Sequence, residues 1–292
     1  MIPEIIFHKG DNSRPLAVFV HGMGMNMKAW TDPEKAKILG GRYPLRILLY
    51  GNNALITPFE DLKDLGFSLL AWTQSRPVGP METAVKELGD VLQEHRAYTG
   101  NGVIFICHSR GGLITRKYLE DPLGPPRGLI TLATPHLGTS MARWPVFISP
   151  LTSLVYQLSK GLSRREIDTA FQRILGFLSS SGLRELLPGS DFFSTLRDTK
   201  QEGARYISVG GTNPDLAKPV LPGLPDLLAK VVPGRLIPEE MREGLGDGLV
   251  TAASARLPYA DEHRDFPVNH AAILFDRAVR DFIVESALGM QE

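Results

Sequence analysis

Short runs of aliphatic and β-branched residues alternate with longer amphipathic stretches along most of the chain. The apolar runs predict β-strands, and the amphipathic stretches, whose apolar residues recur every three or four positions, predict helices. We expect strands at residues 16–20, 67–72, 103–107, 128–132 and 205–209, with weaker candidates at 5–8 and 46–50, and helices at 82–98, 111–119 and 271–287. This alternation favours an α/β protein with a mostly parallel central sheet and helices on both faces.

The alternation stops between residues 139 and 199, where apolar residues recur at helical spacing and no strand pattern intervenes. We therefore expect an inserted helical cap at 139–199, within a core formed by residues 1–138 and 200–292. The stretch 214–238 is rich in proline, which favours a long surface loop.

Charge and cysteine content narrow the function classes. The 292 residues carry 32 Lys+Arg and 32 Asp+Glu, a balance that gives no electrostatic signature of a nucleic-acid partner or an anionic membrane. The single cysteine excludes an internal disulfide and a multi-thiolate metal site. No apolar run reaches about 20 residues, and the N-terminal sequence does not have the pattern of a signal peptide. We expect a cytoplasmic protein without stable membrane insertion, and the oligomeric state stays open.

Four serines stand in Ser-x-Gly strings, and their contexts differ: Ser109, Ser159, Ser180 and Ser208. Ser109 alone follows an apolar strand pattern and precedes a helix pattern that opens with two glycines. A serine between a buried strand and a helix lies on a sharp turn that exposes its hydroxyl at the carboxyl edge of the sheet. The glycines at 111 and 112 remove Cβ atoms where helix and strand pass closely. The alternative is a plain helix N-cap.

The string Cys107-His108-Ser109-Arg110-Gly111 resembles the nucleophile motif Gly-x-Ser-x-Gly of the α/β-hydrolase superfamily, in its bacterial lipase and esterase branch. It departs from the motif at Cys107, a position that requires a small residue. The resemblance implies the α/β-hydrolase fold, a serine nucleophile at Ser109 and a Ser-Asp-His triad, which needs no cofactor.

The strand pattern at 16–20 runs into His21-Gly22-Met23-Gly24, which resembles the oxyanion loop of the same superfamily. By this resemblance the backbone N–H groups of Met23 and Arg110 form the oxyanion hole. His21 is expected to hydrogen-bond the loop, the alternative being a proton shuttle.

The resemblance also implies the chain order Ser, acid, His. His270 then becomes the expected base, because it directly precedes the last helix pattern, and His263, within a highly charged run, is the alternative. Asp247 stands in Gly246-Asp247-Gly248-Leu249-Val250, which resembles the acid turn of bacterial lipases. Asp215 is the alternative acid, and a simple Asx turn is the structural alternative for Asp247.

The string Ala133-Thr134-Pro135-His136 resembles the segment that leads into the cap of bacterial lipases and esterases. Apolar residues near the expected site are candidates for an acyl pocket, although each can also belong to the core: Met23, Met25, Trp144 and Phe147. The resemblance therefore implies a serine carboxylic-ester hydrolase, a lipase or esterase, acting on small-molecule or lipid esters with apolar acyl groups.

Three alternatives stay open at this point. An acyltransferase or a thioesterase would use the same triad, and some members of the superfamily bind ligands without turnover. The third concerns a structural Ca²⁺ site, for which Asp261, Glu262 and Asp265 could supply oxygen ligands. We expect a solvated charged run there and no bound metal.

Overall fold

The computed structural model describes residues 4–38, 41–42, 55–143, 179–197, 199–216 and 237–291. Within these ranges the main sheet has seven strands in the order β1-β5-β2-β6-β7-β8-β9, and only β1 runs antiparallel to its neighbour. The strands are β1 (Ile5–His8), β2 (Leu16–Val20), β5 (Ser68–Trp72), β6 (Val103–His108), β7 (Pro126–Leu132), β8 (Arg205–Gly211) and β9 (Glu262–Phe266). A separate short hairpin pairs β3 (Lys37–Ile38) with β4 (Gly41–Arg42).

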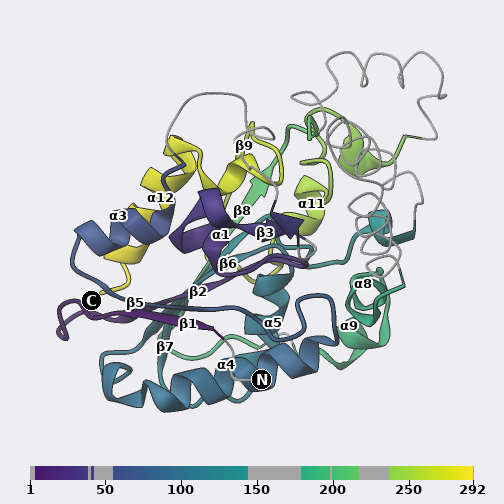
Figure 1. The fold of residues 1–292 in the computed structure, drawn as a ribbon. Helices are drawn as coiled ribbons and strands as arrows, with labels where there is room; N and C mark the ends of the chain where they lie inside the picture. Colours follow the sequence, from purple (N-terminus) through teal and green to yellow (C-terminus); the bar gives the residue numbers. More distant parts are fainter. Residues whose placement is uncertain are drawn as a thin grey trace.

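Helices cover both faces of this sheet (Figure 1). On one face lie α3 (Pro58–Asp64) and α12 (Arg277–Leu288), and on the other lie α4 (Met81–Glu94) and α5 (Arg110–Tyr118). The remaining described helices are short: α1 (Lys28–Thr31), α8 (Ser181–Glu185), α9 (Asp191–Thr195) and α11 (Ala252–Ala255). Single 3₁₀ turns span Pro33–Lys35, Arg96–Tyr98, Ser140–Arg143, Glu239–Met241 and Ala272–Leu274.

The core is divided into two layers by the sheet, as the twofold periodicity of a strand requires. In β2, Ala17 and Phe19 face the layer under α3 and α12, whereas Leu16, Val18 and Val20 face the layer under α4 and α5. All five side chains are fully buried. Burial on both faces explains why β2 reads as a continuous apolar run instead of an alternating one.

The prediction of a mostly parallel α/β sheet is confirmed. Six of the seven predicted strands agree with described strands to within two residues at each end, and the seventh, at 46–50, lies outside the described residues. Most of the charged segment 261–265 lies in the edge strand β9, and Asp261, just before it, pairs with Lys200 while Glu262 pairs with Arg205. Solvent exposure at a sheet edge allows this charge density.

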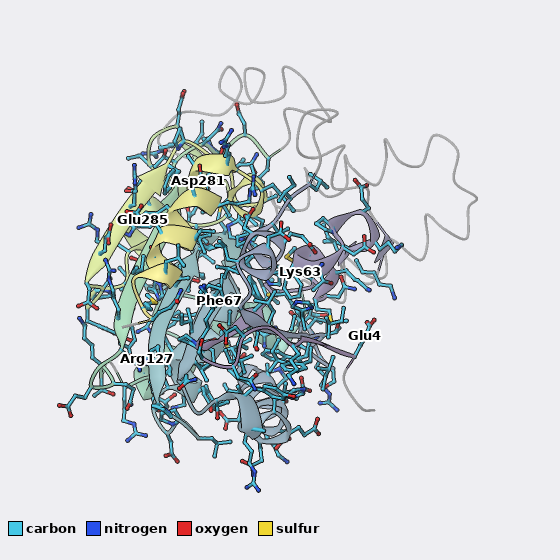
Figure 2. The ribbon with its side chains drawn as sticks, turned by 90° about the vertical axis from the view of Figure 1, so that its left-hand side faces the viewer. Glu4, Lys63, Phe67, Arg127, Asp281 and Glu285 are labelled. Carbon is cyan, nitrogen blue, oxygen red and sulfur yellow. The ribbon has the colours of Figure 1, made fainter. Side chains whose placement is uncertain are left out.

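The last helix begins later than the pattern predicts. Asp276 caps α12 by accepting a hydrogen bond from the Val279 N–H, so a 3₁₀ turn and a break occupy the first residues of the predicted helix. On α12 itself, Asp281 and Glu285 are exposed (Figure 2) while Phe282 is buried against the sheet. The amphipathic pattern therefore predicted the face but not the start.

Most of the predicted insertion, residues 144–178, lies outside the described residues, as does most of the proline-rich stretch. The described part of 139–199 contains α8 and α9 but no strand, and the chain re-enters the sheet at β8. The division into core and cap stays a prediction.

Candidate active site

The turn between β6 and α5 holds Ser109 in a strained conformation. Its φ is 52° and its ψ is −128°, a region that residues with a side chain rarely occupy. The Ser109 N–H donates to the Leu132 carbonyl at 2.8 Å, and the Thr134 hydroxyl donates to the Ser109 carbonyl at 2.8 Å. The strain is thus held by contacts with the end of β7, as a nucleophile elbow requires.

Close packing around the elbow explains its glycines. A Cβ on Gly111 would lie 2.6 Å from the Val20 carbonyl oxygen, and one on Gly112 would lie 2.2 Å from the Thr134 hydroxyl. Cys107 is fully buried, and burial raises the pKa of its thiol to about 12. It packs as a small neutral residue beside Thr115.

Asp247 and His270 are joined by a buried hydrogen bond. The His270 Nδ1 lies 2.8 Å from the Asp247 Oδ2, while the Asp247 Oδ1 accepts from the N–H groups of Leu249 (2.9 Å) and Val250 (2.7 Å). One carboxylate therefore makes the Asx turn and orients an imidazole at the same time. The proton on Nδ1 leaves Nε2 of His270 as the basic nitrogen.

The two positions beside Asp247 require glycine for different reasons. Gly248 has φ of +97°, which favours glycine, and a Cβ on Gly246 would lie 2.6 Å from backbone atoms of Glu240. Gly211, at the end of β8, also packs directly against Asp247. The turn that contains Asp247 therefore packs against the carboxyl edge of the sheet.

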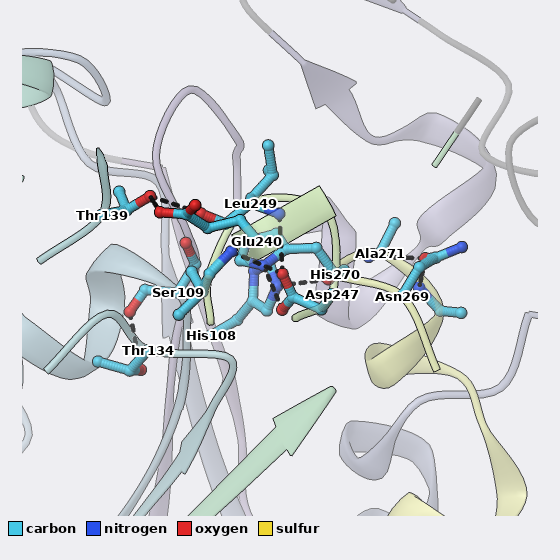
Figure 3. A network of polar contacts seen from close by, with 12 residues as sticks. His108, Ser109, Thr134, Thr139, Glu240, Asp247, Leu249, Asn269, His270 and Ala271 are labelled. Carbon is cyan, nitrogen blue, oxygen red and sulfur yellow. Dashed lines mark hydrogen bonds and ion pairs between the residues drawn. The ribbon is translucent and has the colours of Figure 1, made fainter. Parts of the chain in front are cut away.

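His108 connects the imidazole to the serine elbow (Figure 3). Its Nε2 donates to the His270 carbonyl at 2.9 Å, and the two rings are 4.8 Å apart between centroids. Burial, followed by the nearby His270, holds the pKa of His108 well below its usual value. His270 thus contacts the residue that directly precedes Ser109, and the Ser109 hydroxyl forms no hydrogen bond within the described part of the chain.

The loop that follows β2 approaches the same serine. A Cβ on Gly22 would lie 3.1 Å from the Ser109 Cβ and 2.8 Å from the His108 Nδ1, so only glycine fits there. No acceptor among the described residues takes the N–H of Met23 or of Arg110. Both backbone donors expected for the oxyanion hole are therefore without an acceptor in the described ranges, one in the residue after Ser109 and the other in the loop that approaches it.

The alternative candidates form a separate group. The His263 Nδ1 lies 2.8 Å from the Ser208 hydroxyl and its Nε2 lies 3.1 Å from the Asp265 carboxylate, on β8 and the edge strand β9. Ser208 is completely buried. At Asp215 the backbone N–H donates to the Asn213 side-chain oxygen at 2.9 Å, which forms an Asx turn. The structure therefore brings Asp247 together with His270, not with His263.

The structure describes two of the four residues expected to line an acyl pocket. Trp144 and Phe147 lie outside the described residues. Met23 and Met25 are half-buried and pack against the two core layers. The carboxylates of Asp261 and Glu262 pair with basic side chains, and the described ranges contain no group of three metal-ligating side chains.

Several residues that support the site had no sequence signal. Buried Glu240 accepts hydrogen bonds from Thr139 and Ser140, and its carbonyl accepts the Gly248 N–H at 2.8 Å (Figure 3). Asn269 caps the turn after His270 through the N–H groups of residues 271 and 272. Glu240 is 101 and 100 residues from Thr139 and Ser140 in sequence, so a local motif could not find it.

Comparisons with known proteins agree with this architecture. The mature lipase BlEst2 of Bacillus licheniformis superposes with a TM-score of 0.61 and 19% identity, covering 97% of each chain. The chain therefore has the α/β-hydrolase fold. A carboxylesterase of the archaeon Nitrososphaera gargenis has a TM-score of 0.53 and 14% identity over 99% of this chain and 94% of its own. An esterase of Thermogutta terrifontis has a TM-score of 0.53 and 16% identity over 99% and 95%.

Comparison of sequences finds similarity over a smaller part of the chain. The sequence model of the palmitoyl protein thioesterase family matches residues 17–160, which include the loop at 21–24, the turn that contains Ser109 and the Ala133-Thr134-Pro135-His136 segment. A search of curated proteins finds no match. No helix in the described ranges has the length and apolar character needed to cross a bilayer.

Proposed function

We propose that the protein is a serine hydrolase that cleaves carboxylic esters with apolar acyl groups. In this proposal Ser109 is the nucleophile, His270 the general base and Asp247 the residue that orients it. The observation that carries the proposal is the Asp247–His270 hydrogen bond of 2.8 Å beside the strained elbow of Ser109.

The geometry supports a two-step reaction. The Ser109 Oγ attacks the acyl carbon, and its proton passes to His270 Nε2. The N–H groups of Met23 and Arg110 stabilise the negative oxygen of the tetrahedral intermediate. The bond to the leaving alkoxide breaks as that oxygen takes the proton from His270. Water then attacks the acyl-enzyme, gives its proton to Nε2, and the released Ser109 Oγ recovers a proton from His270.

Hydrolysis of thioesters is the second candidate, because the sequence model that matches residues 17–160 describes thioesterases. The same groups would act, with a thiolate as the leaving group. Ratios of kcat/KM for an octanoyl ester and an octanoyl thioester separate the two candidates. A higher value for the oxygen ester favours the first and the reverse favours the second.

We expect Ser109→Ala to lower kcat on p-nitrophenyl esters by about 10⁴–10⁶-fold, because the covalent intermediate can no longer form. Ser180→Ala is the matched control, since Ser180 also precedes x-Gly but caps α8. The control should keep its kcat and lose only about 1 kcal/mol of stability. Equal activity in Ser109→Ala and the unaltered protein would contradict the proposal.

A further inference from the structure

The side chain of Arg110 is buried where a charge is costly. The residue is 0% exposed, and its guanidinium donates only to uncharged acceptors in the described ranges, namely the carbonyls of Pro77 (3.0 Å) and Gly79 (2.6 Å) and the Gln74 amide oxygen (3.4 Å). Burial lowers its pKa to about 10, although the charges of Glu185 and Glu87 oppose the change. A buried cation held by neutral oxygens stabilises a fold weakly, which indicates another role.

The Pro77 carbonyl, one of these acceptors, also accepts a hydrogen bond from the expected oxyanion loop. The Pro77 carbonyl accepts the Gly24 N–H at 2.9 Å in addition to the Arg110 guanidinium. A single oxygen atom therefore connects the residue after the nucleophile with the loop that carries Met23. Both backbone donors of the expected oxyanion hole are tied to the segment that follows β5.

Gln74 extends this connection to His21. The Gln74 backbone N–H donates to His21 Nε2 at 3.1 Å, and its side-chain amide donates to the His21 carbonyl at 3.0 Å. Because Nε2 is an acceptor, the proton of the ring is on Nδ1, which donates to the Gly22 carbonyl at 2.9 Å. Burial lowers the pKa of His21 to about 4, so the ring stays neutral and this tautomer persists at neutral pH.

The hydrogen bond to Gly22 sets the direction of the next N–H. The Gly22 carbonyl and the Met23 N–H belong to one planar trans peptide group, so they point in opposite directions. When the His21 ring holds the Gly22 carbonyl in place, it therefore also sets the direction of the Met23 N–H. We propose that Arg110, Gln74 and His21 form a relay of positioning residues that aims the Met23 N–H at the oxyanion.

This inference rests on the proposed function and assigns the roles of three side chains within it. The relay should stabilise the tetrahedral intermediate and the transition states on either side of it, because the negative oxygen is absent from the bound substrate. A misplacement of about 1 Å in such a site costs about 10²-fold in rate. Disturbing the relay should thus lower kcat by about 10–100-fold and leave KM within about threefold.

Two substitutions of His21 separate the relay from general packing. In His21→Asn the side-chain amide nitrogen stands near the place of Nδ1 and can donate to the Gly22 carbonyl. In His21→Gln the side-chain oxygen reaches the place of Nε2 and accepts from Gln74, but the Gly22 carbonyl loses its donor. We expect His21→Asn to keep kcat within about fivefold and His21→Gln to lose about 10–100-fold. Equal losses in the two variants would overturn the proposal.

Arg110→Met tests the other end of the relay, with Arg116→Met as the matched control. Arg116 is also a buried arginine of α5, but it donates to His136, which is not part of the relay. Both variants should have a lower Tm, whereas only Arg110→Met should have a lower kcat. Its affinity for a trifluoromethyl ketone, whose adduct with Ser109 carries an oxyanion, should fall by the same factor as kcat/KM.

The outcomes distinguish failure of the inference from failure of the proposed function. A kcat in Arg110→Met equal to that of Arg116→Met, or unchanged affinity for the ketone, would overturn the relay in an active enzyme. Absence of turnover and of ketone binding in the unaltered protein would instead overturn the proposed function, and the relay with it. If Arg110→Met does not fold, the His21 pair still decides the inference.

Discussion

At the scale of single residues, the acid of the proposed triad is testable through its hydrogen bonds. In Asp247→Asn the amide oxygen can keep the bonds to the N–H groups of Leu249 and Val250, which places the NH₂ group against His270. The imidazole must then carry its proton on Nε2, where it cannot accept the proton of Ser109. We expect kcat at pH 8 to fall by about 10⁴-fold while the circular dichroism spectrum is unchanged.

Asp265→Asn is the control for this substitution. Asp265 also contacts a histidine, His263, but on the edge strand β9 away from Ser109. Its kcat should stay within about threefold of the unaltered value. A loss of less than tenfold in Asp247→Asn, or a similar loss in both variants, would contradict the assigned acid.

The sequence could identify candidate residues because each had a strong local context. Ser109 lies between a strand pattern and two glycines, and Asp247 lies between two glycines; the structure gives a steric reason for all four. His21 was expected to hydrogen-bond the loop, but its connection through Gln74 to the side chain of Arg110 had no such signal. The members of this relay are 36 and 53 residues apart in sequence, and only the folded sheet edge brings them together.

At the scale of elements, the crossing of α5 over the end of β2 depends on a glycine. A Cβ at Gly111 would meet backbone oxygen at 2.6 Å, whereas one at Gly89, inside α4, would meet its nearest side-chain atom at 3.8 Å. We expect Gly111→Ala to lower the free energy of unfolding by about 1–3 kcal/mol and also to lower kcat, because Val20 precedes the oxyanion loop. Gly89→Ala should raise the free energy of unfolding by about 0.5–1 kcal/mol.

Urea unfolding and kcat of the two variants check this pair. A Gly111→Ala variant as stable as Gly89→Ala would contradict the close approach of helix and strand. An unchanged kcat together with lowered stability would limit the effect of Gly111 to packing.

Elements that are buried on both faces were the easiest to predict from the sequence. The apolar runs of β2 and β6 match the described strands closely, because burial on two sides removes polar residues. The helix α3 was missed, since its seven residues cover fewer than two full periods of a helical pattern. The edge strand β9 was recognised only as a solvated charged run, because its charges hide any alternation.

At the scale of the whole molecule, buried neutral histidines predict loss of stability in mild acid. Burial holds the pKa of His21 at about 4 and the pKa values of His108 and His136 well below their usual range. Below pH about 6.5 the unfolded chain takes up protons on these residues and the folded chain does not. The free energy of unfolding should be about 4 kcal/mol lower at pH 5.5 than at pH 7.5.

Urea titrations at the two pH values measure this difference directly. His136→Gln should remove about a third of it, because one of the three groups no longer titrates. Equal stability at both pH values would contradict the burial of these histidines in the neutral form.

The global fold class followed from the alternation of strand and helix patterns, but the strand order did not. Nothing in the local sequence places β5, at residues 68–72, between β1 and β2. That placement arises from crossovers whose packing involves residues far apart in the chain. The same long-range packing assembles the site, because its parts follow β2, β6, β8 and β9.

The central claim is that Ser109 is a nucleophile activated by His270. The most direct measurement is covalent labelling by a fluorophosphonate, with the modified peptide mapped by mass spectrometry. The account predicts one label per chain, located at Ser109, absent in Ser109→Ala and strongly slowed in a variant with His270→Ala. Labelling at another serine, or labelling of Ser109 at an unchanged rate without His270, would contradict it.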